Sequence, residues 1–203
     1  MKYSWLDSAG GRELNLGNIG RGVSVCLLLA SSPALAGPTG GSVAAGSARI
    51  QNNGSTTVIT QSTGRAVINW KDFSVNANES VKFVDPSSSS VTLNRVTGGN
   101  TSQILGSISS NGQVFIVNPA GIVFGKTATV DVAGLLATTA NITNSDFMKG
   151  NYHFTDAPAG SSVINEGSIT IHDAGLGALV APHVRNTGFI QATLGRVALA
   201  AGS

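Results

Sequence analysis

NGQVFIVNPAGIVFG, residues 111–125, is the stretch that decides the fold of this chain. It holds two short apolar runs, Val114–Val117 and Ile122–Phe124, on either side of four residues with turn chemistry. The Val, Ile and Phe residues of these runs favour the pleated, buried surface of a β-strand. The stretch therefore predicts two strands joined by a tight turn.

The four residues between the runs, Asn118-Pro119-Ala120-Gly121, have the composition of a β-turn. Pro119 fixes φ at the second position, the Asn118 side chain can bond the backbone two residues on, and Gly121 suits the last position. From the residues alone, an ordinary turn in a β-protein remains an open interpretation of this pattern.

The composition of the whole chain also favours β-structure. Charged residues make up 11% of the 203 residues, well below the roughly 25% of ordinary globular proteins. There are 26 glycines, and small polar and β-branched residues are frequent. A long β-structure with tight turns is expected, whereas disorder would require more charge and fewer apolar residues. The length suffices for one domain, with or without a cleaved leader.

Charge and cysteine content exclude several classes of function. The net charge is +2, and without residues 1–36 it is +1, from nine Lys and Arg against eight Asp and Glu. Neither value predicts binding to nucleic acid or to an anionic membrane. The single cysteine, Cys26, lies in the predicted leader. The mature chain therefore has no disulfide scaffold, thiolate metal site or cysteine nucleophile.

Residues 1–36 have the pattern of an extended secretory signal peptide. Three basic residues precede the apolar run Val23–Ala30, Pro33 interrupts it, and the small residues Ala34 and Ala36 stand at the cleavage positions. We expect cleavage after Ala36. The apolar run is shorter than the roughly 20 residues that a membrane-spanning helix needs, so stable membrane insertion is not expected.

Other parts of the chain alternate between strand-like runs and polar turns. Asp85-Pro86 and the serines after it predict a loop. Leu135–Ala140 and Asp146–Lys149 are too short to change an all-β class. The strand-like runs before the decisive stretch are Ser47–Ile50, Thr57–Thr60, Gly64–Asn69, Ser80–Val84 and Val91–Val96.

An internal repeat appears near the C-terminus. Residues 165–169 and 186–190 share the pattern Asn-x-Gly-x-Ile at a spacing of 21, and residues 177–181 can be paired with 195–199 at a spacing of 18. Repeats of about 20 residues with short strands and glycine turns are typical of a β-solenoid. We expect the repeated isoleucines to stack inside, and the repeated asparagines to exchange side-chain hydrogen bonds at a turn.

No cluster of residues predicts catalysis, a metal or a cofactor. His153, His172 and His183 lack metal-ligand spacing and are best interpreted as exposed turn residues. The carboxylates are scattered, so the chain is not expected to be a polysaccharide-active enzyme, although several β-helix proteins are. Trp70 and Phe73 can form either a docking patch or part of a core or cap, and the core is favoured.

Four motifs follow one another along the chain, namely Ala66–Phe73 (AVINWKDF), Leu93–Thr97 (LNRVT), Ser102–Gly106 (SQILG) and Asn118–Gly121 (NPAG). Together and in this order they resemble the two-partner secretion (TPS) domain of filamentous haemagglutinins and high-molecular-weight adhesins. The resemblance runs from about Gly41 to the C-terminus. The family's turn usually reads Asn-Pro-Asn-Gly, and Ala120 replaces its second Asn here. The Asn-Pro-Asn-Leu motif of many members has no counterpart, which favours the branch without it.

The resemblance implies an all-β fold for residues 37–203, a right-handed parallel β-helix with an N-terminal β cap. It also implies secretion by a Gram-negative bacterium through Sec and the periplasm. The periplasmic domains of an outer-membrane β-barrel transporter would be the partner, and the β-helix would fold outside the cell. The residues expected to carry folding and transporter recognition are Asn118, Pro119, Ala120 and Gly121, followed by Asn69, Trp70 and Asn94.

A second interpretation of the sequence is an adhesin whose own surface binds a host-cell receptor or glycan. A third interpretation is a polysaccharide-active enzyme, but the sequence shows no cluster of carboxylates for such a reaction. Under the first interpretation we expect a monomer at the cell surface or in the medium, without cofactor, metal or nucleic acid. The sequence leaves open whether the chain is a short exoprotein or a fragment of a longer one.

Overall fold

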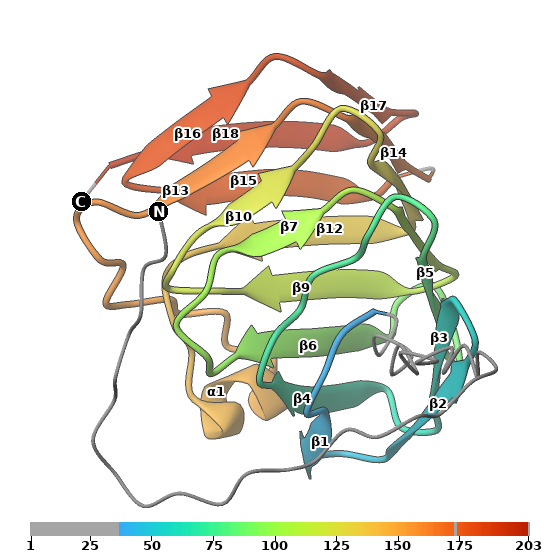
Figure 1. Cartoon of the computed structure of the whole chain (residues 1–203). Coiled ribbons are helices and arrows are strands. Elements are labelled where there is room, and N and C mark those ends of the chain that lie inside the picture. Colours follow the sequence, from blue (N-terminus) through green and yellow to red (C-terminus); the bar gives the residue numbers. More distant parts are fainter. Residues whose placement is uncertain (1–36, 173, 203) are drawn as a thin grey trace, which may run out of the picture. The chain divides into compact units, whose positions relative to one another are not determined.

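The computed structural model describes residues 37–172 and 174–202. The predicted leader, with Ala34 and Ala36, lies outside the described residues, so the expected cleavage site stays a prediction. The described chain folds into eighteen short strands and one helix, α1 (Asn144–Lys149), as Figure 1 shows. Neither the six residues of α1 nor any other described segment forms a helix that is long and apolar enough to cross a membrane.

The strands form three sheets, here called sheets I, II and III. Sheet I contains β1 (Ser42–Ala45), β4 (Arg65–Trp70), β6 (Val91–Val96), β9 (Gln113–Val117), β12 (Gly134–Thr138), β15 (Leu176–Ala181) and β18 (Arg196–Ala201). Sheet II contains β7 (Ser102–Ile104), β10 (Ile122–Phe124), β13 (Ser162–Asn165) and β16 (His183–Asn186). Sheet III contains β2 (Ala48–Asn53), β3 (Thr56–Gln61), β5 (Ser80–Val84), β8 (Ser107–Ser110), β11 (Thr129–Val132), β14 (Ser168–Ile171) and β17 (Phe189–Ala192).

From β6 on, the chain visits sheets I, II and III in turn and then returns to sheet I one level further along (Figure 1). Strands of successive coils are parallel and lie about 4.8 Å apart. Gln113 of β9 pairs with Val91 of β6 and Gly134 of β12, so one coil takes 22 residues and the next 21. The result is the predicted right-handed parallel β-helix. The two apolar runs of the decisive stretch became β9 and β10, which belong to different sheets.

Alternate side chains of the strands between the two ends of the solenoid point into one continuous apolar core. In sheet II the inward residues of adjacent coils stack on one another, Ile104 on Phe124 and Ile122 on Val163. All four are at most 1% exposed. Burial of such side chains contributes roughly 1.5–3 kcal/mol each, so the stacked interior is the main source of stability.

The predicted N-terminal β cap is present at the first coil. β1 pairs antiparallel with β4, and β2 pairs antiparallel with β3, whereas the pairs further along the solenoid are parallel. The reversed strands cover the backbone edge at which pairing of the solenoid begins. Uncovered edges of this kind invite pairing with other chains.

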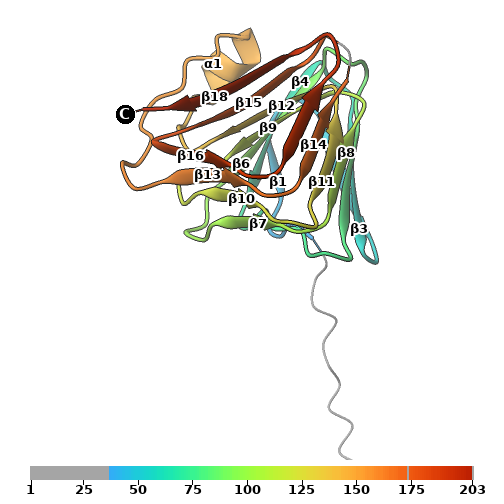
Figure 2. The ribbon, with the colours of Figure 1, turned by 90° about the horizontal axis from the view of Figure 1, so that it is seen from above.

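Residues 139–161 leave the coil between β12 and β13 and carry α1 over the outer face of sheet I, as Figure 2 shows. Thr143 caps the N-terminus of the helix, and its hydroxyl accepts a bond from the Asp146 backbone N–H. Phe147 of α1 is fully buried against outward side chains of sheet I. The resulting second apolar cluster contains Val67, Val91, Leu93, Phe115, Val117, Ile142 and Phe147.

The first predicted repeat is confirmed, and the second is wrong in register. Asn165 pairs with Asn186 and Ile169 with Ile190, at the predicted spacing of 21. Leu179 pairs with Leu199, however, which makes the second spacing 20 and not 18. Matching of glycines caused the error. Gly195 lies against Gly175 and not Gly177, since the Arg196 N–H bonds the Gly175 carbonyl.

Candidate functional site

Asn118 lies at the corner where the chain passes from sheet I to sheet II. Its side chain is fully buried and uses both ends of the amide. Nδ2 donates to the Asn100 carbonyl at 3.0 Å and to Ser102 Oγ at 2.9 Å, while Oδ1 accepts from the Ala120 N–H at 2.9 Å. The bond to Ala120 is the one the sequence predicted, two residues on from Asn118. The bonds from Nδ2 to residues of the previous coil were not predictable from the turn itself.

The rest of the turn also follows its predicted chemistry. The Gly121 N–H donates to the Asn118 carbonyl at 2.9 Å, which closes the four-residue turn. Gly121 has φ of +107°, a conformation that residues with a side chain rarely adopt. Ala120 is half-buried, and its carbonyl accepts from Thr101 Oγ1 at 2.8 Å. The Asn118 N–H donates to the Thr138 carbonyl at 3.0 Å. The corner therefore connects three successive coils.

Trp70 and Asn94 meet inside the β-helix. The indole Nε1 of Trp70 donates to Asn94 Oδ1 at 3.0 Å, and Asn94 Nδ2 faces the Phe115 carbonyl at 3.3 Å. Trp70 also packs edge-on against Phe73, with ring centroids 5.6 Å apart. Trp70 is 1% exposed and Phe73 is fully buried. The interpretation as part of the core is therefore confirmed, and a docking patch of these two side chains is wrong for the folded state.

Asn69 and Arg95 meet on the outer face of the same two strands, because neighbouring residues of a strand point to opposite faces. Arg95 Nη1 donates to Asn69 Oδ1 at 3.3 Å and to Asn144 Oδ1 at 2.6 Å. Its Nε donates to Asn141 Oδ1 at 3.0 Å, and Nη2 donates to the Ile142 carbonyl. Partial burial lowers the pKa of the Arg95 guanidinium, which still remains protonated. Arg95 therefore holds the α1 segment against sheet I.

The predicted site residues thus form three separate connections and no common surface. Asn118–Gly121 close a corner, Trp70 and Asn94 connect β4 to β6 on the inside, and Asn69 takes part in the outer Arg95 contacts. Sequence reasoning placed Arg95 within a motif but gave it no role. The Asn and Ile residues it bonds in the α1 segment lie 46 to 49 positions away, beyond the reach of a local pattern.

The histidines are exposed, as predicted, but His183 is the first residue of β16 and does not belong to a turn. His172 Nε2 lies 2.5 Å from Asp131 Oδ1, with more than half of both side chains accessible. The sequence did not predict this pair, because its members lie 41 positions apart on adjacent coils. Across residues 37–172 and 174–202, no three His, Cys, Asp or Glu side chains gather closely enough to hold a metal ion.

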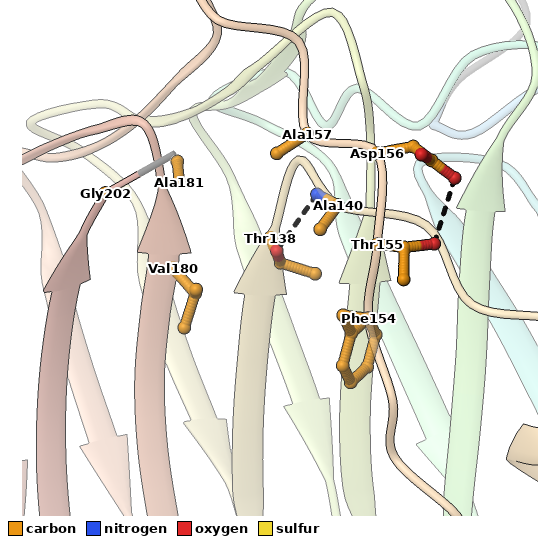
Figure 3. A pocket seen from close by; sticks show the side chains of 9 residues that line it. All are labelled: Thr138, Ala140, Phe154, Thr155, Asp156, Ala157, Val180, Ala181 and Gly202. Carbon is orange, nitrogen blue, oxygen red and sulfur yellow. Dashed lines mark hydrogen bonds between the residues drawn. The ribbon is translucent and has the colours of Figure 1, made fainter.

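A hollow of about 420 Å³ lies beside the outer face of sheet I (Figure 3). In Figure 3, Phe154, Thr155, Asp156 and Ala157 lie on one segment that passes over the strands. The Asp156 carboxylate accepts from Thr155 Oγ1 at 2.9 Å. The lining offers one carboxylate and two threonine hydroxyls but no basic side chain. Its residues are Thr138, Ala140, Phe154, Thr155, Asp156, Ala157, Val180, Ala181 and Gly202.

These features define a capped, single-chain parallel β-helix whose coils are connected by buried polar side chains. Comparison with known proteins then identifies the family. The TPS secretion domain profile matches residues 34–203. The chain belongs to this family, and it is the TPS secretion domain of a two-partner secreted exoprotein. Such exoproteins are secreted by Gram-negative bacteria and interact with an outer-membrane transporter of the TPS type.

Named relatives agree with this assignment. The solved structure of the HMW1 secretion domain from Haemophilus influenzae matches with a TM-score of 0.78 and 38% identity, over 82% of this chain and 45% of that one. Two heme/hemopexin-binding proteins of Haemophilus influenzae are each 39% identical, over 134 and 109 residues. These matches cover 65% and 54% of this chain but only 15% and 12% of the relatives.

Replacement of Arg95 by Lys should loosen the α1 segment. Lysine cannot form the fork of bonds to Asn69, Asn141 and Asn144, and hydrogen bonds to a charged group contribute about 1.5–3 kcal/mol. We expect tryptic cleavage after Lys149 to accelerate about tenfold or more, as followed by mass spectrometry. Arg196→Lys, on the exposed edge strand β18, is the matched control. Equal cleavage of the two variants would remove the holding role from Arg95.

Proposed function

We propose that the transporter reads the motif residues of this domain before they fold, and that folding then removes them from reach. The observation behind this is burial. Asn118 and Asn94 are fully buried and Trp70 is 1% exposed, so a partner that met the completed β-helix would not touch these side chains. An extended chain presents all of them. Strand addition to a sheet edge of the transporter's periplasmic domains is a recognition mode that suits an extended segment.

In this proposal residues 1–36 direct the chain through Sec and are removed after Ala36. The chain reaches the transporter unfolded and folds outside the cell. Each coil pairs mainly with its two neighbours, so folding can begin at one coil and spread along the solenoid. Asn118, Trp70 and Asn94 each bond residues of an adjacent coil, which gives them a second role once the chain has emerged.

We further propose that the domain has no catalytic activity of its own and acts as a monomer. The exposed His172–Asp131 pair and the apolar hollow beside Phe154 are the strongest alternatives within the described residues. The His172 ring bonds the Asp131 carboxylate and no hydroxyl or thiol, and the hollow pairs the Thr155 hydroxyl with the Asp156 carboxylate but offers no basic side chain. Binding of a host receptor or glycan by this domain has no particular observation in its favour.

Export from a Gram-negative host tests the proposal. The 203-residue chain is expressed with and without the TPS transporter encoded nearest its gene, and the cell-free medium is assayed by immunoblot. We expect the chain in the medium only when the transporter is present. Retention in the periplasm beside a functional transporter would contradict the proposed function.

Asn118→Ala and Asn186→Ala distinguish the motif from an ordinary coil corner. Both change a corner asparagine, but Asn118 is fully buried with three side-chain bonds, while Asn186 is exposed and accepts one bond from Asn165 at 2.9 Å. We expect Asn118→Ala to reduce export at least several-fold and Asn186→Ala to leave it near the wild-type level. Equal export of both would mean that the turn has no special part in secretion.

A further inference from the structure

Asp85 carries a buried carboxyl group, which the hydrogen-bonded side chains of neighbouring coils surround. It follows β5, and the sequence predicted it only as part of a loop. In the structure it is 6% exposed and lies at the corner between sheets III and I. Its own backbone is fixed by Asn111, which accepts from the Asp85 N–H at 2.7 Å and donates to the Asp85 carbonyl at 2.8 Å.

The Oδ2 atom of Asp85 accepts a hydrogen bond from a serine hydroxyl. Ser110 Oγ donates to Asp85 Oδ2 at 2.7 Å, and the Gly112 N–H donates to the same Ser110 Oγ at 2.8 Å. The serine hydroxyl therefore accepts one bond and gives its single hydrogen to Oδ2. This side of the carboxyl group is satisfied in either protonation state.

The other oxygen, Oδ1, lies 3.2 Å from Thr92 Oγ1. An ionised Asp85 would leave no hydrogen for a bond between these two oxygens. Thr92 Oγ1 also lies 2.6 Å from Gln61 Oε1. The Gln61 amide is oriented by its Nε2, which donates to the Thr63 carbonyl at 2.6 Å, so Oε1 faces Thr92 as an acceptor. A threonine hydroxyl has only one hydrogen to donate. The short contact to Gln61 requires it, which leaves Thr92 Oγ1 and Asp85 Oδ1 as two facing acceptors.

We propose that the folded β-helix binds a proton on Asp85 Oδ1 and closes its first coils around a neutral carboxylic acid. The acid then donates to Thr92 Oγ1, and Thr92 donates to Gln61 Oε1. The chain of bonds runs from Ser110 on β8 through Asp85 and Thr92 to Gln61 on β3. It joins three successive coils, and every buried oxygen in it has a hydrogen-bond partner. This inference does not depend on the proposed function in export.

The electrostatic surroundings agree with the geometry. Burial raises the pKa of the Asp85 carboxyl above its ordinary value, and the polar contacts with Ser110, Thr92 and the Gly112 backbone oppose this to a smaller degree. No charged side chain among the described residues bonds or pairs with Asp85. The charged and titratable groups on the neighbouring elements all have side chains that are at least partly exposed; they are Arg65 on β4, Lys82 on β5, Arg95 on β6, Asp131 on β11 and His172 after β14.

The sign of the pH dependence follows from the raised pKa. The unfolded chain loses the Asp85 proton near the ordinary value of 3.8, and the folded chain loses it at higher pH. Between these two values the folded state holds one proton more, so stability falls as pH rises. The contribution of the proton is complete below 3.8 and is gone above the folded pKa. Within this window the unfolding equilibrium constant rises about tenfold per pH unit.

Asp85→Asn tests the inference, because asparagine reproduces the protonated group and does not titrate in this range. Urea unfolding of the 203-residue chain and its variant is followed by circular dichroism from about pH 4 to about pH 8. We expect the variant to be the more stable form at the upper end, with a gap that narrows as pH falls. A gap that does not change with pH, or a less stable variant at about pH 8, would overturn the proposal.

Two further measurements distinguish the effect of Asp85 from that of other titrating groups and from misfolding of the variant. His172→Gln removes the exposed His172–Asp131 pair and should leave the pH dependence in place. In the unmodified chain, the Asp85 carboxyl carbon is followed by NMR. We expect its signal to titrate above the ordinary aspartate value of 3.8. Titration at or below that value would show that Asp85 folds as a carboxylate.

Discussion

Trp70→Ala is expected to destabilise the domain by about 3–5 kcal/mol, the usual cost of deleting a buried aromatic side chain. The ring is 1% exposed, packs on Phe73 and lies at the capped end of the core. Its removal also leaves Asn94 Oδ1 without its indole donor at 3.0 Å. A buried acceptor without a partner costs about 1–3 kcal/mol more. Urea unfolding, followed by circular dichroism, measures the change.

Two other aromatic variants separate the loss of packing from the loss of the hydrogen bond. Trp70→Phe keeps most of the ring but no N–H, so we expect a smaller cost of about 1–3 kcal/mol from Asn94 alone. Phe189→Ala removes a 57% exposed ring from the last coil and should cost less than about 1 kcal/mol. If Trp70→Ala were as mild as Phe189→Ala, Trp70 would not hold the capped end together.

Local features of the fold were predictable from the sequence. The turn needed only Asn118, Pro119 and Gly121, because its bonds join residues two and three positions apart. The repeat of Asn165 and Asn186 gave the coil length, since side chains stacked in register select the same residue types. The resemblance supplied the cap and the handedness, which neither pattern contains.

Features that join distant residues were not predictable in the same way. The pairing of residues 177–181 with 195–199 was wrong by two positions, which preserves the alternation of inward and outward side chains and therefore leaves the hydrophobic pattern unchanged. Asp85 looked like a loop residue because its burial depends on Thr92, Ser110 and Gln61 from other strands. Most hydrogen-bond partners of Arg95 lie in the α1 segment, residues 139–161, which no sequence repeat predicted.

Buried polar side chains of this domain have a common structural role, which is to connect neighbouring coils. In a solenoid each coil contacts mainly the coils before and after it, so stability depends on connections between neighbours. Asn118, Asn94 and Asp85 each supply such a connection through a buried polar group. Buried polar groups without partners are costly, so each of these side chains favours the one register in which all of its bonds are made.

Gly106→Ala is expected to have a comparably large effect, about 3 kcal/mol or more, through steric overlap. Gly106 closes the SQILG motif at the corner between sheets II and III. A Cβ atom there would lie 2.2 Å from the carbonyl oxygens of Asn76 and Glu79. Both oxygens belong to the backbone of the previous coil, which cannot move away without breaking the bond from the Ser107 N–H to the Glu79 carbonyl at 3.0 Å.

The matched control is Gly99→Ala, a glycine that has open space where the new methyl group would lie. Urea midpoints of the two variants, compared with the unchanged chain, should differ greatly, with Gly99→Ala within about 0.5 kcal/mol of it. Similar midpoints would mean that the corner can widen, and that coil spacing at this position is not fixed by backbone contact. A large difference would instead show that the close stacking of coils requires a glycine at position 106. The same requirement would then apply to Gly188 of the Asn-x-Gly-x-Ile repeat, whose added Cβ would lie 2.2 Å from the Gly167 carbonyl oxygen.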